Sequence, residues 1–114
     1  MPATIQLPDG VPPWVNNDTI SAASPTDVWL SWQLVNTGDE DGNSTGVYFT
    51  VQDPNGTYVA NDYAPQQDIP AGATIEQGAR IDATAFSGGQ GTYWAMLRDP
   101  SGSELGGASI LVTE

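Results

Sequence analysis

The longest run of alternating apolar and polar positions in the chain covers residues 28–35. Its sequence, VWLSWQLV, puts one set of side chains on one face and a second set on the other: Val28, Leu30, Trp32 and Leu34 against Trp29, Ser31, Gln33 and Val35. A period of two is typical of a strand with one buried face. Residues 36–38, NTG, then favour a turn. We therefore predict a central strand with Trp32 in the core and Trp29 in solvent.

Further strand signals recur about every 8–12 residues, separated by residues that favour turns. They span residues 47–53, 57–64, 74–86, 92–99 and 108–113, and no segment keeps a helical period over three turns. Two of the intervening turns share the pattern Asp-Pro-x-Gly and begin at Asp53 and Asp99. Proline is favoured at the second position of such turns. The pattern predicts an all-β fold, an antiparallel β-sandwich of about seven strands.

The first part of the chain has a weaker and more broken pattern. Short extended stretches at 3–7 and 18–22 flank a segment that contains Pro8, Pro12 and Pro13. Such closely spaced prolines exclude a helix there. We interpret residues 1–25 as an N-terminal arm with short strands and residues 26–114 as the sandwich domain. The arm would lie on its own sandwich or on a neighbouring protein.

Three short motifs occur in an order that resembles a known family. Residues 91–95, GTYWA, resemble the tyrosine corner of immunoglobulin-like domains, and they follow 35–39, VNTGD, and 69–72, IPAG. This order resembles the bacterial CARDB-like and related immunoglobulin-like domains, of a kind also found on bacteriophage virions, over roughly residues 26–114. The resemblance implies an immunoglobulin-like β-sandwich, an accessory role and a hydrogen bond from the Tyr93 hydroxyl to nearby backbone.

Charge narrows the range of partners. The chain has 114 residues, which favours one domain, and 14 acidic against 2 basic residues give it a formal charge of −12. This balance argues against nucleic acid and against an anionic membrane surface, because both are bound by clustered Lys and Arg. No segment approaches the ~20 apolar residues of a membrane-spanning helix, so no membrane insertion is expected. Residues 1–30 also lack the pattern of a secretory signal.

The residue types that are missing exclude most enzyme chemistry. The chain has no Cys, His or Lys. Disulfides, thiolate and imidazole metal sites, Ser-His-Asp arrangements and Schiff bases are therefore excluded. An enzyme would depend on carboxylates, such as Asp53 and Asp99 acting as a glycosidase pair. Since each of them begins a turn in which Asp caps its own backbone, we expect no enzymatic activity.

One acidic loop offers oxygen ligands. In residues 39–43, DEDGN, the side chains of Asp39, Asp41 and Asn43 stand at alternate positions, a spacing that suits Ca²⁺. A loop of the EF-hand type would continue with Gly at its sixth position and Glu at its twelfth, where this chain has Ser44 and Thr50. A solvated acidic loop is the alternative interpretation. We expect no other cofactor.

Large side chains are predicted to gather outside one sheet. In an immunoglobulin-like arrangement Tyr48, Trp94, Met96 and Leu111 would form a patch on its outer face, with Arg98 at the edge. Exposed clusters of this kind are frequent docking sites. The arm, through Trp14, would either cover this patch within the chain or help to bind the partner.

These inferences favour a binding or structural role. Our main hypothesis is a structural module of a larger protein assembly, a bacteriophage virion, as a capsid decoration or appended surface protein. The arm and the patch would then hold the particle, and an acidic face would point to solvent. The alternative is an extracellular carbohydrate- or cell-surface-binding module of a secreted bacterial protein, with sugars stacked on the patch.

Overall fold

The structure is a computed structural model that describes residues 2–114. These residues form eleven strands and one short 3₁₀ helix: β1 (Ile5–Gln6), β2 (Trp14–Val15), β3 (Thr19–Ser21), β4 (Val28–Asn36), β5 (Gly42–Asn43), β6 (Tyr48–Gln52), β7 (Tyr58–Tyr63), β8 (Asp68–Ile69), β9 (Thr74–Ile81), η1 (Ala83–Phe86), β10 (Gly91–Arg98) and β11 (Glu104–Thr113). The predicted all-β sandwich is confirmed. Its strands exceed the expected number because five of them have only two or three residues.

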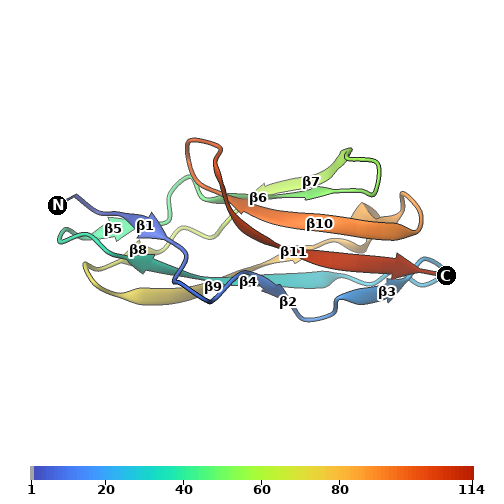
Figure 1. Cartoon of the computed structure of the whole chain (residues 1–114), viewed down its shortest axis with the longest axis horizontal. Helices are drawn as coiled ribbons and strands as arrows, with labels where there is room; N and C mark the ends of the chain where they lie inside the picture. Colours follow the sequence, from blue (N-terminus) through green and yellow to red (C-terminus); the bar gives the residue numbers. More distant parts are fainter. Residues whose placement is uncertain (1) are drawn as a thin grey trace.

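Two sheets face each other in an elongated body of 49 × 23 × 21 Å (Figure 1). In the first sheet, β4 pairs with β9 along one edge and with β1 and β2 along the other. The second sheet has the order β3-β11-β10-β6-β7. The short pair β5-β8 extends the body at the end where β1 lies (Figure 1). The pairing is antiparallel as predicted, except that β3 runs parallel to β11.

The segment expected to form an arm provides strands to both sheets. Strands β1 and β2 pair with β4, and β3 pairs with β11. Between β1 and β2, Leu7 and Pro13 pack against Gly106 of β11, where a Cβ would come within 2.8 Å of the leucine and 3.0 Å of the proline. The segment therefore closes one edge of the sandwich. It does not cover the outer face of the second sheet.

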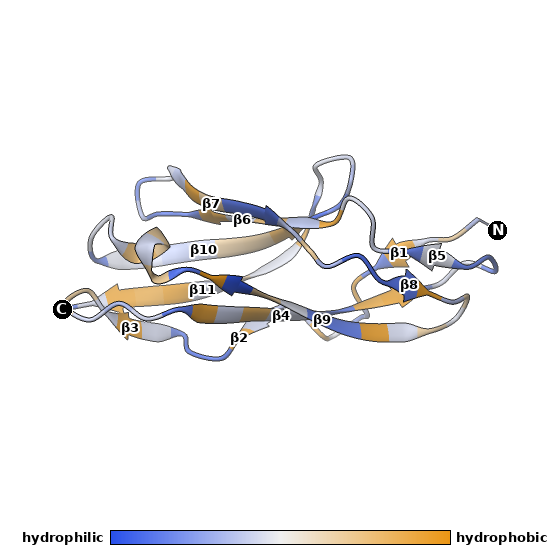
Figure 2. Ribbon diagram, turned by 180° about the vertical axis from the view of Figure 1, so that it is seen from behind, coloured by the Kyte–Doolittle hydropathy of each residue, from blue (hydrophilic) through white to orange (hydrophobic). Residues whose placement is uncertain are grey.

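The core follows the predicted alternation. All four inward side chains of β4 are fully buried, whereas Trp29 is 47 % exposed. They pack in one cluster with apolar side chains of the second sheet: Phe49 and Val51 of β6, Tyr93, Ala95 and Leu97 of β10, and Ile110 and Val112 of β11. In Figure 2, apolar stretches lie on β4 and β11, and a hydrophilic segment leads from β7 to β8. The predicted orientation of the central strand is confirmed.

A buried polar network joins the core to the loops. The indole Nε1 of Trp32 donates a hydrogen bond to Oε1 of Gln77, its partner on β9, at 3.1 Å. The amide of Gln77 in turn donates to Oγ of Ser44 at 3.1 Å and to the carbonyl of Pro65 at 2.6 Å. Buried polar groups need such partners. The network therefore holds the connections before β6 and after β7 against the first sheet.

Asn36, at the end of β4, binds four backbone groups. Its side chain is fully buried. Its Oδ1 accepts hydrogen bonds from the N–H groups of Thr4 (3.1 Å) and Gly38 (3.0 Å). Its Nδ2 donates to the carbonyls of Glu40 (2.8 Å) and Ile69 (3.0 Å). The sequence suggests only a turn residue here, but the amide joins both ends of the β5-β8 extension to the sandwich.

The strand predicted for residues 74–86 ends at Ile81, and η1 follows it. Two carboxylates support this change, because Asp82 accepts a hydrogen bond from the N–H of Thr84 at 3.0 Å and Asp27 accepts one from Ala83 at 2.8 Å. The predicted alternation of residues 82–86 is therefore wrong. The 3₁₀ turn buries Phe86, whose ring centroid lies 5.4 Å from that of Tyr93.

Tyr93 makes the hydrogen bond that the family resemblance implies. Its hydroxyl donates to the carbonyl of Gly89 at 2.9 Å, and its ring is fully buried. Burial raises the pKa of Tyr93 above its ordinary value, and the negative charge of Asp53 adds to the effect. The neutral phenol is therefore the form that the folded state favours.

We expect Asn36→Ala to lower the free energy of unfolding by about 2–4 kcal/mol, because it leaves buried N–H and carbonyl groups without partners. Urea unfolding followed by tryptophan fluorescence measures this. The control, Asn55→Ala in the exposed turn after β6, should change stability by less than about 0.5 kcal/mol. Equal effects of the two substitutions would contradict the role assigned to Asn36.

We expect the stability of the protein to fall as the pH rises above about 10, since Tyr93 ionises more easily in the unfolded chain than in the folded one. Tyr93→Phe should lose about 1 kcal/mol at neutral pH and show a shallower alkaline decline. Urea midpoints measured from pH 7 to 11 for both proteins provide the comparison. An identical decline in the variant would assign the effect to the other tyrosines.

Candidate functional site

The outer face of the second sheet contains four of the five residues that the sequence suggests for partner binding: Tyr48, Trp94, Met96 and Leu111. The strand register pairs Tyr48 with Arg98, Met96 with Thr50 and Leu111 with Thr92. Directly paired side chains lie on the same face of a sheet. We call this surface the aromatic face, and its main members are Tyr48, Tyr58, Tyr63, Trp94, Met96, Arg98 and Leu111.

The exposed part of the aromatic face differs from the expected one. Tyr63 (71 % exposed), Tyr58 (55 %) and Leu111 (44 %) offer the most accessible large side chains. Met96 is only 5 % exposed, so it supports the face from below. Trp94 lies over Gly107 of β11, where a Cβ would come within 2.6 Å of its ring. The sequence predicts a strand that contains Tyr58 and Tyr63, but it does not indicate that they belong to this face.

A tyrosine pair and an arginine add polar groups to the aromatic face. The rings of Tyr48 and Tyr63 have centroids 5.9 Å apart. Arg98 donates hydrogen bonds to the carbonyl of Gly102 at 2.7 Å and to the hydroxyl of Tyr58 at 3.2 Å. These bonds use two of the five donors of a guanidinium group. The arginine is therefore held in place and keeps donors for a further acceptor.

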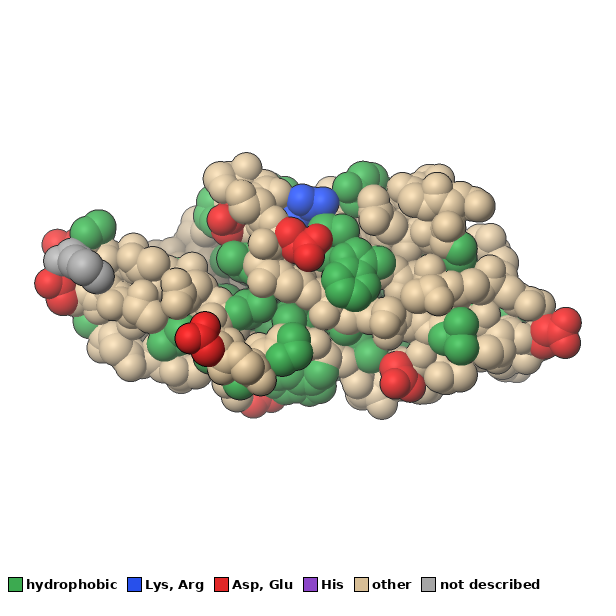
Figure 3. Space-filling model, viewed as in Figure 1, with side chains coloured by type: hydrophobic (Ala, Val, Ile, Leu, Met, Phe, Trp, Pro, Cys, Tyr) green, Lys and Arg blue, Asp and Glu red, His purple; other side chains and the backbone are tan. Residues whose placement is uncertain are grey.

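Charge is scarce on the aromatic face although the chain is strongly acidic. Of the 14 acidic residues, only Glu104 occupies an outward position on β6, β7, β10 or β11. Figure 3 shows hydrophobic side chains near the middle of the view, with one acidic side chain beside them, next to the basic side chain, and the other acidic side chains farther out. Depletion of charge is typical of the centre of a protein interface. The expected acidic face is not present as a continuous surface in this view.

The two arginines have different surroundings. Arg80 lies 3.6 Å from a carboxylate oxygen of Asp27 and 3.7 Å from one of Asp82. No ion pair to Arg98 occurs among residues 2–114. On β6, opposite Met96, the hydroxyl of Thr50 is buried and has no hydrogen-bond partner within the described chain. Such unsatisfied groups are rare in folded proteins. The aromatic face therefore contains a cation whose partner across the strands is Glu104, and a buried hydroxyl without a hydrogen-bond partner in the described chain.

Trp14 does not join the aromatic face. It stands opposite Ser31 in the pairing of β2 with β4, and Ser31 points to the same side as Trp29. Trp14 therefore lies outside the first sheet, on the other side of the sandwich, where it is 37 % exposed. The sequence left open whether Trp14 covers the predicted patch or helps to bind a partner, and only the pairing of β2 with β4 determined which sheet it joins.

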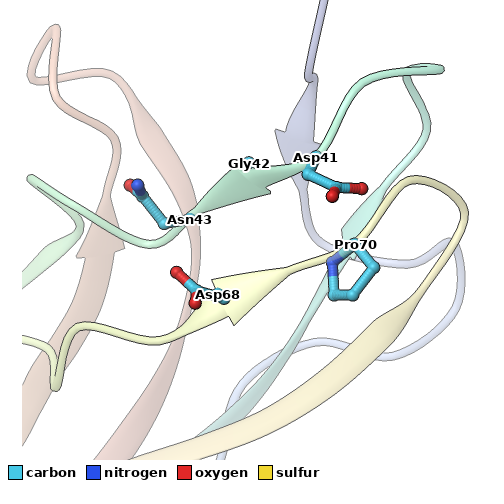
Figure 4. Close-up of a pocket in the computed structure, with 5 residues that line it drawn as sticks. All are labelled: Asp41, Gly42, Asn43, Asp68 and Pro70. Carbon is cyan, nitrogen blue, oxygen red and sulfur yellow. The ribbon is translucent and has the colours of Figure 1, made fainter.

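The acidic loop lines a shallow hollow between β5 and β8 (Figure 4). Asp41 accepts a hydrogen bond from the N–H of Ala71 at 3.1 Å, and Asn43 accepts one from Thr45 at 3.0 Å. Figure 4 shows Asn43 beside Asp68, with Asp41 pointing away from both. Asp39 lies outside this group, in the exposed bend before β5. Within residues 2–114, no three acidic side chains are grouped so that they could hold a metal ion.

Asp53 and Asp99 lie at opposite ends of the second sheet, because β6 and β10 are antiparallel and each residue directly follows its strand. Asp53 accepts hydrogen bonds from the N–H groups of Asn55 and Thr57, both at 2.9 Å. A hydrogen bond from the Ser101 hydroxyl lowers the pKa of Asp99 below its ordinary value, and hydrogen bonds from backbone N–H groups of the same turn contribute to this effect. The structure does not bring the two carboxylates together.

No protein-family model and no curated protein matches this chain. Solved structures do resemble it. An alkylpurine DNA glycosylase of Pseudomonas fluorescens matches all of this chain and 32 % of its own, with a TM-score of 0.74 and 14 % identity. β-Glucosidase 3B of Thermotoga neapolitana (TM-score 0.71, 15 % identity) and a β-glucosidase of Listeria innocua (0.67, 12 %) each match 99 % of this chain and 16 % of theirs.

These similarities show the fold alone, because the identities are low. This chain spans a third or less of each of the three proteins. In each case the matching sandwich is one part of a longer chain. Among residues 2–114, no helix is long and apolar enough to cross a membrane.

We expect calcium at about 10 mM, above the weakest affinities that are typical of calcium modules, to leave the melting temperature unchanged. The reason is that Asp41 and Asn43 already accept backbone hydrogen bonds and that Asp41 points away from Asp68. Differential scanning calorimetry with CaCl₂, and with NaCl at equal ionic strength, measures this. A rise that is specific to calcium and absent in Asp68→Asn would contradict it.

Proposed function

We propose that this chain is a non-enzymatic interaction module that docks onto a larger protein assembly through the aromatic face. One observation carries the proposal: a chain with a charge of −12 keeps this face almost free of carboxylates while exposing Tyr58, Tyr63 and Leu111 on it. Exposed apolar side chains with little charge around them favour association, since few ionised groups must lose their water.

The setting that we propose is the surface of a bacteriophage virion, where the chain would be a capsid decoration or an appended surface protein. The resemblance of its motifs to immunoglobulin-like domains of this kind supports the setting. The occurrence of the same fold as a part of longer chains supports an accessory role. The partner would be a capsid protein or another virion protein.

The chemistry of the face defines the partner surface. Its centre should be apolar or aromatic, to cover Tyr63 and Leu111. It should also present a carboxylate or carbonyl oxygen to Arg98, whose guanidinium retains donors. Around this centre the partner should be neutral or basic, because the loops of this chain carry most of its negative charge. Carbohydrate recognition, the alternative function, would use a different surface, the outer face of the first sheet.

We expect the native chain to sediment with a particle far heavier than its own 12.0 kDa. The double variant Tyr63→Glu with Leu111→Glu should lower its affinity for that particle at least about tenfold, because a carboxylate buried without a partner costs more than about 1.4 kcal/mol. Sedimentation of particles with each purified variant, quantified by immunoblotting, measures the bound fraction.

The matched control is Gln6→Glu with Thr74→Glu, which adds the same charge at exposed positions on the outer face of the first sheet. This variant should remain bound. If the native chain occurs only as a free monomer, or if both double variants bind equally well, docking through the aromatic face is wrong.

A further inference from the structure

The outer face of the first sheet carries two tryptophans that the proposed docking does not use. Trp29 on β4 is 47 % exposed, and Trp14 on β2 is 37 % exposed. Because Trp14 pairs with Ser31, two residues beyond Trp29, the two indoles occupy diagonal positions on neighbouring strands. Such backbone positions lie roughly 7–8 Å apart, and the Trp29 ring extends over Gly78 of β9, on the side of β4 away from β2. We name this surface the tryptophan face.

Trp29 is seated directly on the sheet. Its partner strand β9 has Gly78 at the adjoining position, and a Cβ there would lie within 2.7 Å of the indole Cε2 and 3.0 Å of Cζ2. The missing side chain of Gly78 lets one side of the indole approach the backbone of β9. The exposed remainder of the ring is therefore available for stacking with a ligand.

The backbone of Trp29 is held from both sides. Its N–H donates to Oδ1 of Asn16 at 2.9 Å, and its carbonyl accepts from the N–H of Asn16 at 3.1 Å. On its other side, β4 pairs with β9 along eight residues. An aromatic side chain on a backbone held in this way loses little entropy when a ligand binds. The tryptophan face is thus built before any ligand arrives.

The groups around the indoles are polar. Ser31 and Gln33 follow Trp29 on the outward side of β4, and Glu76 pairs with Gln33. Arg80 stands opposite Trp29, and its guanidinium is oriented by Asp27 at 3.6 Å and by Asp82 at 3.7 Å. Amide, carboxylate and guanidinium groups therefore border the two rings, whereas Ser31 is buried. They can both donate and accept hydrogen bonds.

We propose that the tryptophan face binds a neutral polysaccharide chain. A sugar ring has an apolar face of C–H groups, which packs on an indole by dispersion. It also has hydroxyls at its rim, which need donors and acceptors such as those that border Trp14 and Trp29. Two indoles set apart in polar surroundings fit this ligand better than a protein partner, whose interface has a continuous apolar centre.

Two features define the ligand further. The charge of −12 repels an anionic chain, so the sugar units are uncharged. Both indoles lie on the surface of paired strands, so a ligand would lie along this surface and contact the two rings with its side. A chain of at least two sugar units can cover both rings together. The inference is independent of docking through the aromatic face, which lies on the other side of the sandwich.

The test is affinity electrophoresis of the full chain in native gels that contain hydroxyethylcellulose, xylan, galactomannan or starch, with sedimentation on insoluble cellulose and chitin. We expect at least one of these neutral polysaccharides to retard or retain the protein. Trp29→Ala should weaken that binding at least about tenfold, and Trp14→Ala should weaken it measurably, since each removes a stacking surface. Tyr63→Ala, on the aromatic face, should bind like the native chain.

A measurement without substitutions accompanies these variants. N-bromosuccinimide should oxidise the exposed Trp14 and Trp29 before the buried Trp32, and the bound polysaccharide should protect the first two, as read by peptide mass spectrometry. The proposal is wrong if none of the polysaccharides binds. It is also wrong if binding survives Trp29→Ala, or if it is lost in Tyr63→Ala instead. Neither of these results bears on the sedimentation of the chain with a particle.

Discussion

The burial of Trp32 between the two sheets is the constraint on which the rest of the structure depends. Its indole is fully buried and brings one N–H group into an apolar interior. Gln77 accepts that hydrogen bond, and its own amide then needs acceptors, which Ser44 and Pro65 supply. Each buried polar group thus requires the next one. The connections on either side of β6 and β7 are held close to the first sheet for this reason.

Because the polar groups of this network find their hydrogen-bond partners within the chain, contacts with other molecules are left to the two outer faces. The acidic residues lie mainly in loops and turns, where several cap backbone N–H groups: Asp41, Asp53, Asp82 and Asp99. The aromatic face is poor in charge, whereas the tryptophan face, on the opposite side of the sandwich, is bordered by Glu76 and Arg80. The two proposals assign a protein partner to one and a neutral sugar chain to the other. A chain with both properties would connect a particle to a polysaccharide surface.

The sequence predicts much of the fold because the signals involved are local. The alternation around Trp32, the turns that begin at Asp53 and Asp99, and the hydrogen bond expected of Tyr93 are all present. The errors arise where a distant group changes a local preference. Residues 82–86 alternate like a strand, but the carboxylates of Asp27 and Asp82 hold them in a 3₁₀ turn. The buried role of Asn36 likewise depends on partners up to 33 residues away.

The alternation along the chain predicted the all-β class and the side of β4, β6, β10 and β11 that faces the core. The physical reason is that the period of two is a property of the extended backbone and needs no partner. Only the tertiary structure decided which outward side chains became neighbours. Strand pairing placed Trp14 beside Trp29, Tyr63 beside Tyr48, and Asp53 far from Asp99. Pairing depends on contacts between segments that are distant in the chain, and the alternation within one strand carries no record of them.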